Sequence, residues 1–348
     1  MTLTVLFAIP GNLNARTGGY GYDRAVIGAL SALGWTVGHL ALPGGFPEPS
    51  HADLAETAGL LEGIEAGSLV LVDGLAFSAS PEIFEPHAGR LRLVALIHHP
   101  LAYETGLSDK RAAELMAFER RALRLARAVI VTSPETGRAL VASFDVDRAR
   151  ITVALPGTER QARAAAAGDP PMILSIGSLI PRKGHDVLIE ALGGITDLDW
   201  RCRIVGDPGR DGTCARLLDR MIVDRGLGGR VVLTGALDEI GSEYANADLF
   251  ALATLYEGYG MVFAEALAHG LPIVGTRAGP VADLVPEDAG LLVAPGDAKA
   301  LEGALRTMLA DCGLRKTKAD GAWRAGRSLP TWETSARRIA ETLSKVAS

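Results

Sequence analysis

Two glutamates eight residues apart flank a glycine-rich turn in the second half of the chain. Glu257 stands at one end of this turn and Glu265 follows it. A short apolar run that ends at Leu252 predicts a strand before the turn, and a helix is predicted after it. Backbone N–H groups at a helix start favour phosphate, and carboxylates accept hydrogen bonds from sugar and ribose hydroxyls. The alternative is one N-cap glutamate and one ordinary surface glutamate.

A basic pair forms the second candidate site. Arg182 and Lys183 lie in a loop that runs from Gly177 to Gly184, after a predicted strand and before an apolar helix. Adjacent cations in such a loop can neutralise a diphosphate leaving group, whereas most basic pairs are solvated surface charges. The loop is not a Walker P-loop, because the G-x4-GK[ST] order is missing.

The first half of the chain offers a histidine pair and a glycine run. His98 and His99 end a predicted buried strand, and a histidine that merely caps the strand is the alternative for His98. We expect the ring of His99 to point the other way, since side chains alternate along a strand. The run Gly18-Gly19 lets the backbone approach a phosphate or sugar closely, or else forms a flexible turn. It lacks the tight dinucleotide fingerprint G-x-G-x-x-G.

Short apolar runs that alternate with helix-like segments must position these residues. Most runs are continuous, which is typical of a parallel sheet covered by helices on both faces. In the first half we predict strands at Thr4–Ile9, Thr36–Leu40, Leu69–Val72, Leu93–Ile97, Val129–Val131 and Ile151–Val153. In the second half we predict strands at Met172–Ile176, Arg201–Val205, Val231–Thr234, Leu249–Leu252, Ile273–Val274 and Leu291–Val293. The pattern predicts two doubly wound α/β domains.

The break between the two patterns lies in a stretch rich in Pro, Gly and Ala between Pro156 and Pro171. We therefore expect one domain at residues 1–165, a second at 166–330, and a closing helix at 331–348. Ligands of open parallel sheets bind beyond the carboxyl ends of the strands. The motifs are accordingly expected to line a crevice between the two sheets.

Composition and charge exclude several classes of protein. The net charge of −6 gives no general attraction to nucleic acid, so no nucleic-acid partner is expected. Cys202, Cys214 and Cys312 are odd in number and far apart, which indicates reduced thiols and neither a zinc site nor a disulfide frame. No basic leader precedes the first strand and no apolar run approaches roughly 18 residues, so we expect a cytoplasmic protein.

Two D-x-D sequences could suggest a metal-dependent transferase of another fold. They are Asp145-Val146-Asp147 and Asp197-Leu198-Asp199, and both precede strands, whereas such a metal site follows one. We interpret both as turns. No other acidic or histidine cluster has convincing metal-ligand spacing, so neither a metal nor a cofactor is predicted.

The run Glu257–Glu265, continued by Ala266–Val274, resembles the E-x7-E signature of the family 4 retaining glycosyltransferases, which have the GT-B fold of two facing Rossmann-like domains. Further segments of the chain are also similar to the family. They are Gly177–Gly184, Val205–Asp207, Thr234-Gly235 and Ala289–Val293, and, more weakly, Gly18-Gly19, His98 and Val129–Ser133. Nearly the whole chain is covered by the resemblance.

The resemblance implies transfer of a sugar, expected to be a hexose, from a nucleotide-diphosphate-sugar donor to an acceptor with retention at the anomeric carbon. It implies that Glu265 holds the nucleotide ribose, Glu257 the sugar hydroxyls, and that His98 touches the donor sugar. His98 and Glu257 are thus the expected catalytic residues. The expected donor-binding residues are Gly18, Gly19, Arg182, Lys183, Gly258, Tyr259, Gly260, Met261, Val262 and Glu265.

This chain departs from the family at one position, where Ser178 replaces the common arginine after the first glycine. Lys183 is therefore the stronger expectation for the diphosphate, and compensation by Arg182 stays open. A sugar-nucleotide epimerase of the same fold and an inactive glycosyltransferase-like partner subunit are the alternative functions. Lys110–Arg127 predicts a basic amphipathic helix, which either packs its apolar face in the fold or lies peripherally on the inner face of an anionic membrane.

Overall fold

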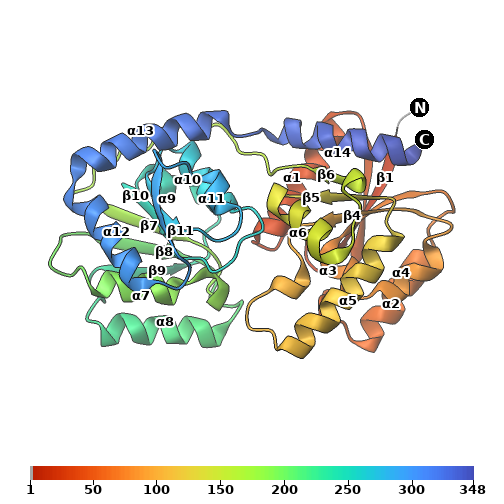
Figure 1. Ribbon diagram of the computed structural model, residues 1–348, viewed down its shortest axis with the longest axis horizontal. Coiled ribbons are helices and arrows are strands. Elements are labelled where there is room, and N and C mark those ends of the chain that lie inside the picture. Colours follow the sequence, from red (N-terminus) through yellow and green to blue (C-terminus); the bar gives the residue numbers. More distant parts are fainter. Residues whose placement is uncertain (1–2) are drawn as a thin grey trace. The chain divides into compact units, whose positions relative to one another are not determined.

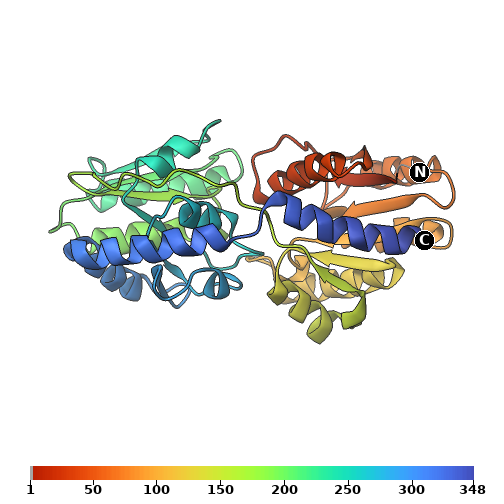
Figure 2. The same cartoon turned by 90° about the horizontal axis from the view of Figure 1, so that it is seen from above.

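The computed structural model describes residues 3–348, and the chain divides into two compact units. Unit 1 comprises the chain up to Gly157 together with Pro330–Ser348, and unit 2 is Thr158–Leu329. Each unit is a sheet with helices on both faces, as Figures 1 and 2 show. Each unit is described by itself below.

The sheet of unit 1 has six parallel strands in the order β2-β1-β3-β4-β5-β6. Their bounds are β1 Thr4–Pro10, β2 Thr36–Leu42, β3 Leu69–Asp73, β4 Arg92–Ile97, β5 Ala128–Val131 and β6 Ile151–Val153. All six strands predicted for the first half of the chain are confirmed. Every residue of β3 and β5 is buried, which agrees with their continuous apolar sequences.

The helices of unit 1 are α1 Gly18–Ala32, α2 His51–Glu62, α3 Gly74–Phe77, α4 Pro81–Phe84, α5 Asp109–Leu125, α6 Pro134–Phe144 and α14 Trp332–Ala347. The predicted C-terminal helix is thus present as α14, and it packs against α1 and β6 (Figures 1 and 2). The ring of Trp332 meets the ring of Tyr22 edge-on at 5.6 Å, and Thr342 donates a hydrogen bond to Thr152. The end of the chain therefore completes the first unit.

The sheet of unit 2 has the order β12-β11-β10-β7-β8-β9, and all of its pairs are parallel. The bounds are β7 Met172–Ile176, β8 Arg201–Val205, β9 Val231–Gly235, β10 Leu249–Leu252, β11 Ile273–Thr276 and β12 Gly290–Val293. All six strands predicted for the second half are confirmed. The strand order reverses between β7 and β10, and such reversals are where open α/β sheets bind ligands.

Seven helices cover this second sheet. They are α7 His185–Gly193, α8 Gly212–Asp224, α9 Gly241–Ala245, α10 Met261–Ala268, α11 Val281–Leu284, α12 Ala298–Ala310 and α13 Cys312–Ser328. The helices α7, α8 and α12 share one apolar core with the sheet, and α9, α10, α11 and α13 share another. The two-domain α/β fold expected from the sequence is therefore confirmed.

Both D-x-D sequences form turns, as predicted. Asp145 ends α6 in the left-handed region with φ 58°, and Asp147 caps the short 3-10 helix Arg148–Arg150. Asp197 lies in the turn that follows α7 and is paired with Arg306.

Candidate active site

Hydrogen bonds join the loop after β7 to the end of β10. The Gly177–Gly184 loop and the turn at Glu257 therefore lie side by side in unit 2. The carbonyl oxygen of Arg182 accepts hydrogen bonds from the backbone N–H of Leu255 at 2.8 Å and from the hydroxyl of Thr254 at 3.1 Å. Gly184 ends the loop with φ +63°, and a Cβ at this position would collide with the carbonyl oxygen of Ala253. Only glycine permits this close approach without strain.

Glu257 is buried and forms one charge cluster with the partly buried basic pair. The Nζ of Lys183 lies 2.6 Å from Oε1 of Glu257, and a guanidinium nitrogen of Arg182 lies 3.8 Å from Oε2. Glu257 is 6% exposed. Burial opposes its ionisation, but the charges of Lys183 and Arg182, with hydrogen bonds from Lys183 and Thr254, hold the pKa of Glu257 below its ordinary value. Glu257 is therefore ionised at neutral pH.

The guanidinium of Arg182 reaches the Glu257 loop as well. It donates a hydrogen bond to the carbonyl oxygen of Tyr256 at 2.8 Å, and its side chain is 15% exposed. This geometry places the second cation of the loop beside Glu257, although Ser178 occupies the position that is arginine in the family pattern. Its role toward a diphosphate stays a prediction.

The helix α10 begins at the glycine turn that the sequence singled out. Gly260 precedes it with φ 98°, and no side chain caps its first turn, which contains Met261 and Val262. An uncapped helix start presents backbone N–H groups and the positive end of the helix dipole to an anion. Gly258 and Tyr259 lie in the turn just before it, and Tyr259 is buried.

Glu265 lies in the second turn of α10 and is oriented by a tyrosine. The hydroxyl of Tyr244 donates a 2.7 Å hydrogen bond to Oε2 of Glu265. Burial raises the pKa of Glu265, and the bond from Tyr244 partly opposes this rise. The Tyr244 ring stacks on His269 at 5.1 Å, which fixes its position. One carboxylate oxygen is thus held by the protein, and the other can accept from a ligand hydroxyl.

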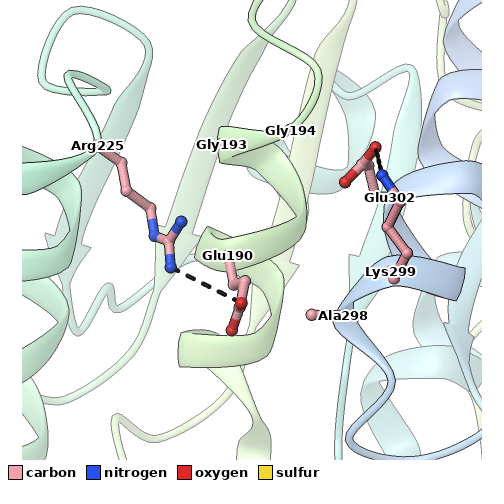
Figure 3. Close-up of a pocket in the computed structure, with 7 residues that line it drawn as sticks. All are labelled: Glu190, Gly193, Gly194, Arg225, Ala298, Lys299 and Glu302. Carbon is pink, nitrogen blue, oxygen red and sulfur yellow. Dashed lines mark hydrogen bonds and ion pairs between the residues drawn. The ribbon is translucent and has the colours of Figure 1, made fainter.

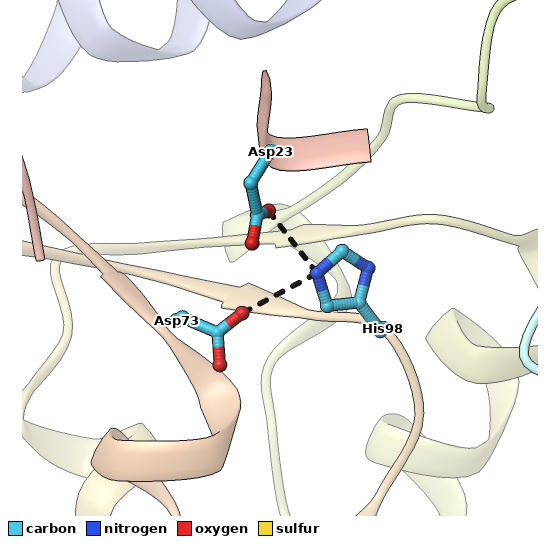
Figure 4. Close-up of side chains that lie close together, drawn as sticks. All are labelled: Asp23, Asp73 and His98. Carbon is cyan, nitrogen blue, oxygen red and sulfur yellow. Dashed lines mark hydrogen bonds and ion pairs between the residues drawn. The ribbon is translucent and has the colours of Figure 1, made fainter. Parts of the chain in front are cut away.

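In unit 1, His98 follows β4 and is held by two carboxylates. Its Nε2 lies 3.2 Å from Oδ1 of Asp23, which belongs to α1, and 3.4 Å from Oδ2 of Asp73, the last residue of β3 (Figure 4). Burial alone would lower the pKa of His98, but the charges and hydrogen bonds of Asp23 and Asp73 raise it well above its ordinary value. His99 makes a separate contact, with Nε2 3.2 Å from Glu104.

The glycine run lies in the first turn of α1. Gly18 and Gly19 open this helix, and the Thr17 side chain accepts a hydrogen bond from the N–H of Tyr20. A Cβ on Gly19 would lie 3.6 Å from Cδ2 of His98, so the backbone at this position runs close to the imidazole ring. Neither the flexible turn nor the dinucleotide fingerprint describes this segment.

Three side chains beside the predicted residues escaped the sequence-based prediction, namely Asp23, Asp73 and Tyr244. Asp73 directly follows the apolar run of β3, at the strand edge where ligands bind, so its position was a usable signal. Asp23 lies within the apolar sequence of α1, and its partner His98 is 75 residues away. Tyr244 belongs to a five-residue helix with no recognisable pattern.

The ligand atoms of Asp23, Asp73 and His98 lie within 4.8 Å of one another. The Nε2 of His98 contacts both carboxylates, whereas Oδ2 of Asp23 is buried and has no hydrogen-bond partner among the described residues. That no metal takes part stays a prediction.

A surface depression of about 240 Å³ in unit 2 lies between α7, the end of α8 and the start of α12. It is lined by Glu190, Gly193, Gly194, Arg225, Ala298, Lys299 and Glu302 (Figure 3). None of these residues belongs to a motif described above. The ion pairs Arg225–Glu190 and Lys299–Glu302 occupy its walls, so its polar groups serve each other.

The predicted basic helix is α5, and its apolar side is buried in the core of unit 1. Several of its charges are paired. Arg121 lies 2.8 Å from Glu85, and Arg111 lies 3.4 Å from Glu114. Among residues 3–348, no helix is long and apolar enough to cross a membrane. Peripheral membrane contact through α5 stays a prediction.

Two doubly wound units, with glycine-bordered cation and carboxylate sites at strand ends, define a protein of the GT-B class. Residues 170–311 match the family model described as Glycosyl transferases group 1, and residues 71–161 match that of Glycosyltransferase Family 4. Over these residues the chain is similar to the glycosyltransferases of family 4.

Named relatives support the similarity to this family, and solved structures support the fold. The chain is 35% identical over 193 residues to the GDP-mannose-dependent alpha-(1-6)-phosphatidylinositol monomannoside mannosyltransferase of Mycolicibacterium smegmatis, covering 51% of this chain and 48% of that protein. It is 28% identical over 265 residues to the D-inositol 3-phosphate glycosyltransferase of a Nocardioides species, covering 68% of this chain and 57% of that protein. These matches span about half the length of each relative.

Two solved structures share the fold over almost the whole chain. The sucrose-phosphate synthase of Thermosynechococcus elongatus has a TM-score of 0.84 at 21% identity, covering 99% of this chain and 98% of the other. HepE of Anabaena, solved in complex with UDP and glucose, has a TM-score of 0.76 at 20% identity, covering 98% and 99%.

Proposed function

We propose that this protein is a glycosyltransferase that moves a sugar from a nucleotide-diphosphate-sugar donor to an acceptor and retains the anomeric configuration. Unit 2 binds the donor and His98 of unit 1 supports the transfer. The observation that carries the proposal is the charge cluster of Lys183, Arg182 and the buried Glu257, next to the uncapped start of α10. Similarity to the family and the UDP bound in HepE support it.

The chemistry requires positive charge around a leaving diphosphate. As the bond to the anomeric carbon breaks, negative charge grows on the phosphate oxygen, and preorganised cations and N–H groups lower the barrier. Lys183 and the N–H groups of Met261 and Val262 take this role. Lys183 is already held by Glu257, so it needs little reorganisation when a phosphate arrives.

The carboxylates hold the two ends of the donor in the proposed arrangement. Glu257 accepts hydrogen bonds from sugar hydroxyls, and Glu265, fixed by Tyr244, accepts from the ribose. Positioning of this kind converts binding energy into a productive geometry for the transfer. No side chain here acts as a covalent nucleophile in the proposal, and no metal or cofactor is required.

A thermal-shift screen tests donor binding. Nucleoside diphosphates and their sugars, with uridine, guanosine and adenosine as bases, are added separately to the protein. A binding donor at a hundred times its Kd stabilises the native state by about 2.7 kcal/mol and raises the melting temperature. The response is expected to disappear in Lys183→Ala and to persist in Lys299→Ala, a lysine of the same unit outside the site. No response to any nucleotide would refute the proposal.

The anomeric outcome is tested by NMR of the transfer product. With the donor found in the screen, the configuration of the new linkage is read from the coupling constant of its anomeric proton. Retention supports the mechanism proposed here, and inversion contradicts it.

A further inference from the structure

The ring of His98 faces two carboxylates with the same nitrogen. Its Nε2 lies 3.2 Å from Asp23 and 3.4 Å from Asp73 (Figure 4). An ionised carboxylate repels the lone pair of a ring nitrogen, so two carboxylates beside Nε2 favour a proton on that nitrogen. With Nε2 directed at the carboxylates, Nδ1 is the ring nitrogen that can face a ligand.

The two carboxylates are deep in unit 1. Asp23 is fully buried, and Asp73 is 1% exposed. Within the described chain, His98 is the cationic partner of both. A neutral ring would leave these carboxylates in a low-dielectric interior without a counter-charge, which is costly. Burial, with the neighbouring Asp73, raises the pKa of Asp23 to about 6, while the charge of His98 opposes the rise. Above that pH Asp23 is ionised, and the cationic ring removes the cost of its burial.

The other residues that contact His98 hold it in place and carry no charge. From α1, the Tyr22 ring meets it edge-on at 5.2 Å, and burial raises the pKa of Tyr22 so that its hydroxyl stays neutral. That hydroxyl donates to the carbonyl oxygen of Ala154. Directly after β5, the Thr132 hydroxyl donates to the backbone carbonyl oxygen of His98 itself. Asp73 also accepts a hydrogen bond from the N–H of Leu75 through Oδ1, so one of its oxygens contacts Leu75 and the other contacts His98.

We propose that Asp23 and Asp73 are positioning residues that keep His98 as an imidazolium, so that it meets the substrate as a fixed cation and hydrogen-bond donor through Nδ1–H. Figure 4 shows this nitrogen on the side of the ring turned away from both carboxylates, and the side chain is 20% exposed. His98 then acts on a phosphate or hydroxyl oxygen of the sugar substrate. It does not act as a general base, because both ring nitrogens of an imidazolium carry protons.

The sugar substrate is taken from the glycosyltransferase function proposed above, whereas the charge of the ring is a property of unit 1 alone. The first experiment therefore uses the free protein. Nitrogen-15 NMR of the imidazole side chains, with His98→Gln to identify the signal, reports both ring nitrogens. Protonation of both between about pH 6 and pH 8.5 is expected. A neutral ring, or a titration midpoint near the ordinary value of about 6.5, would overturn the assignment.

The second experiment removes one anion and follows the consequence. Asp73→Asn keeps the cap on Leu75, because asparagine also caps helices, but removes the charge. The titration midpoint of His98 is expected to fall by about 1 to 3 pH units. Glu65→Gln makes the same charge change at an exposed site of unit 1 and is expected to leave it unmoved. An unchanged midpoint in Asp73→Asn contradicts the positioning role.

The third experiment tests whether the charge of His98 affects the rate of transfer. The rate of transfer by the wild type is expected to stay level from neutral to alkaline pH, whereas in Asp73→Asn it falls as the ring loses its proton. A rate that rises in the variant at alkaline pH would indicate a general base and overturn the proposal. If the wild-type protein has a cationic His98 ring but no transferase activity, the proposed function is wrong and the charge of the ring is still established.

Discussion

Glu119 should make the stability of unit 1 fall as the pH rises. This residue of α5 is fully buried; its Oε1 accepts from the Ser78 hydroxyl at 2.8 Å and its Oε2 from the N–H of Leu101 at 3.1 Å. Burial raises the pKa of Glu119 from 4.5 to about 8, although these bonds and one from the N–H of Ala102 oppose the rise. The bonds hold the segment that directly follows His98 and His99.

The sign of the effect follows from the two pKa values. An unfolded chain loses the Glu119 proton near pH 4.5, and the folded chain keeps it until about pH 8. The stabilisation is complete below the lower value, falls as the pH rises between the two values, and is gone above the higher one. The loss amounts to about 1.4 kcal/mol per pH unit, so roughly 2 to 3 kcal/mol between pH 5 and pH 7.

Glu119→Gln isolates this effect. Glutamine cannot ionise, its carbonyl accepts from Leu101, and its amide donates to Ser78, so it reproduces the neutral carboxyl. Urea unfolding read by hydrogen exchange of the β4 peptide reports unit 1 separately from unit 2. The wild type is expected to lose roughly 2 to 3 kcal/mol more than the variant between pH 5 and pH 7. Glu114→Gln, on the same helix but with a side chain that is 43% exposed, serves as the control.

Parallel pH dependences in the wild type and Glu119→Gln would refute the reasoning. They would mean that Glu119 is ionised in the folded protein and that its three hydrogen-bond donors outweigh burial.

Three further outcomes are expected. Lys183→Ala should lower turnover by roughly 10²–10³, as the loss of one transition-state stabiliser does, and near-normal steady-state rates would contradict its role at the diphosphate. Tyr244→Phe removes the 2.7 Å bond to Glu265, so nucleotide affinity measured by calorimetry should fall by roughly tenfold; an unchanged Kd would count against the ribose contact. Gly184→Ala should lower the free energy of unfolding of unit 2 by about 2 kcal/mol or more, and with it the melting temperature. Gly184 has φ +63°, and a Cβ there meets the carbonyl oxygen of Ala253. Gly228→Ala, in open space, is its control, and equal melting of the two variants would refute the strain.

The strands and the donor motifs could be read from the sequence because their signals are local. A continuous apolar run such as β10 reports its own burial, and the turn between Glu257 and Glu265 carries its glycines within nine residues. The spacing also predicted a loop and a helix start at Gly260. These features depend on neighbours in the chain, so a single sequence is enough to find them.

The partners of the predicted residues could not be read in the same way. Nothing near Asp23 indicates that α1 will bring it to His98, and a glutamate among arginines on α5 has the pattern of a solvated helix face. Glu119 is nevertheless fully buried against a serine 41 residues away. Lys183 and Glu257 are 74 residues apart in the chain, and the parallel pairing of β7 with β10 brings them together.

The sequence by itself determined the strand and helix pattern, the two-domain α/β architecture and the segments that carry chemistry, because hydrophobic periodicity and turn residues act over a few positions. The tertiary structure alone decided that the last helix completes unit 1, which carboxylates surround His98, and which glutamate is buried without an ion pair. Charge state depends on burial and on partners distant in the chain, and both are products of folding.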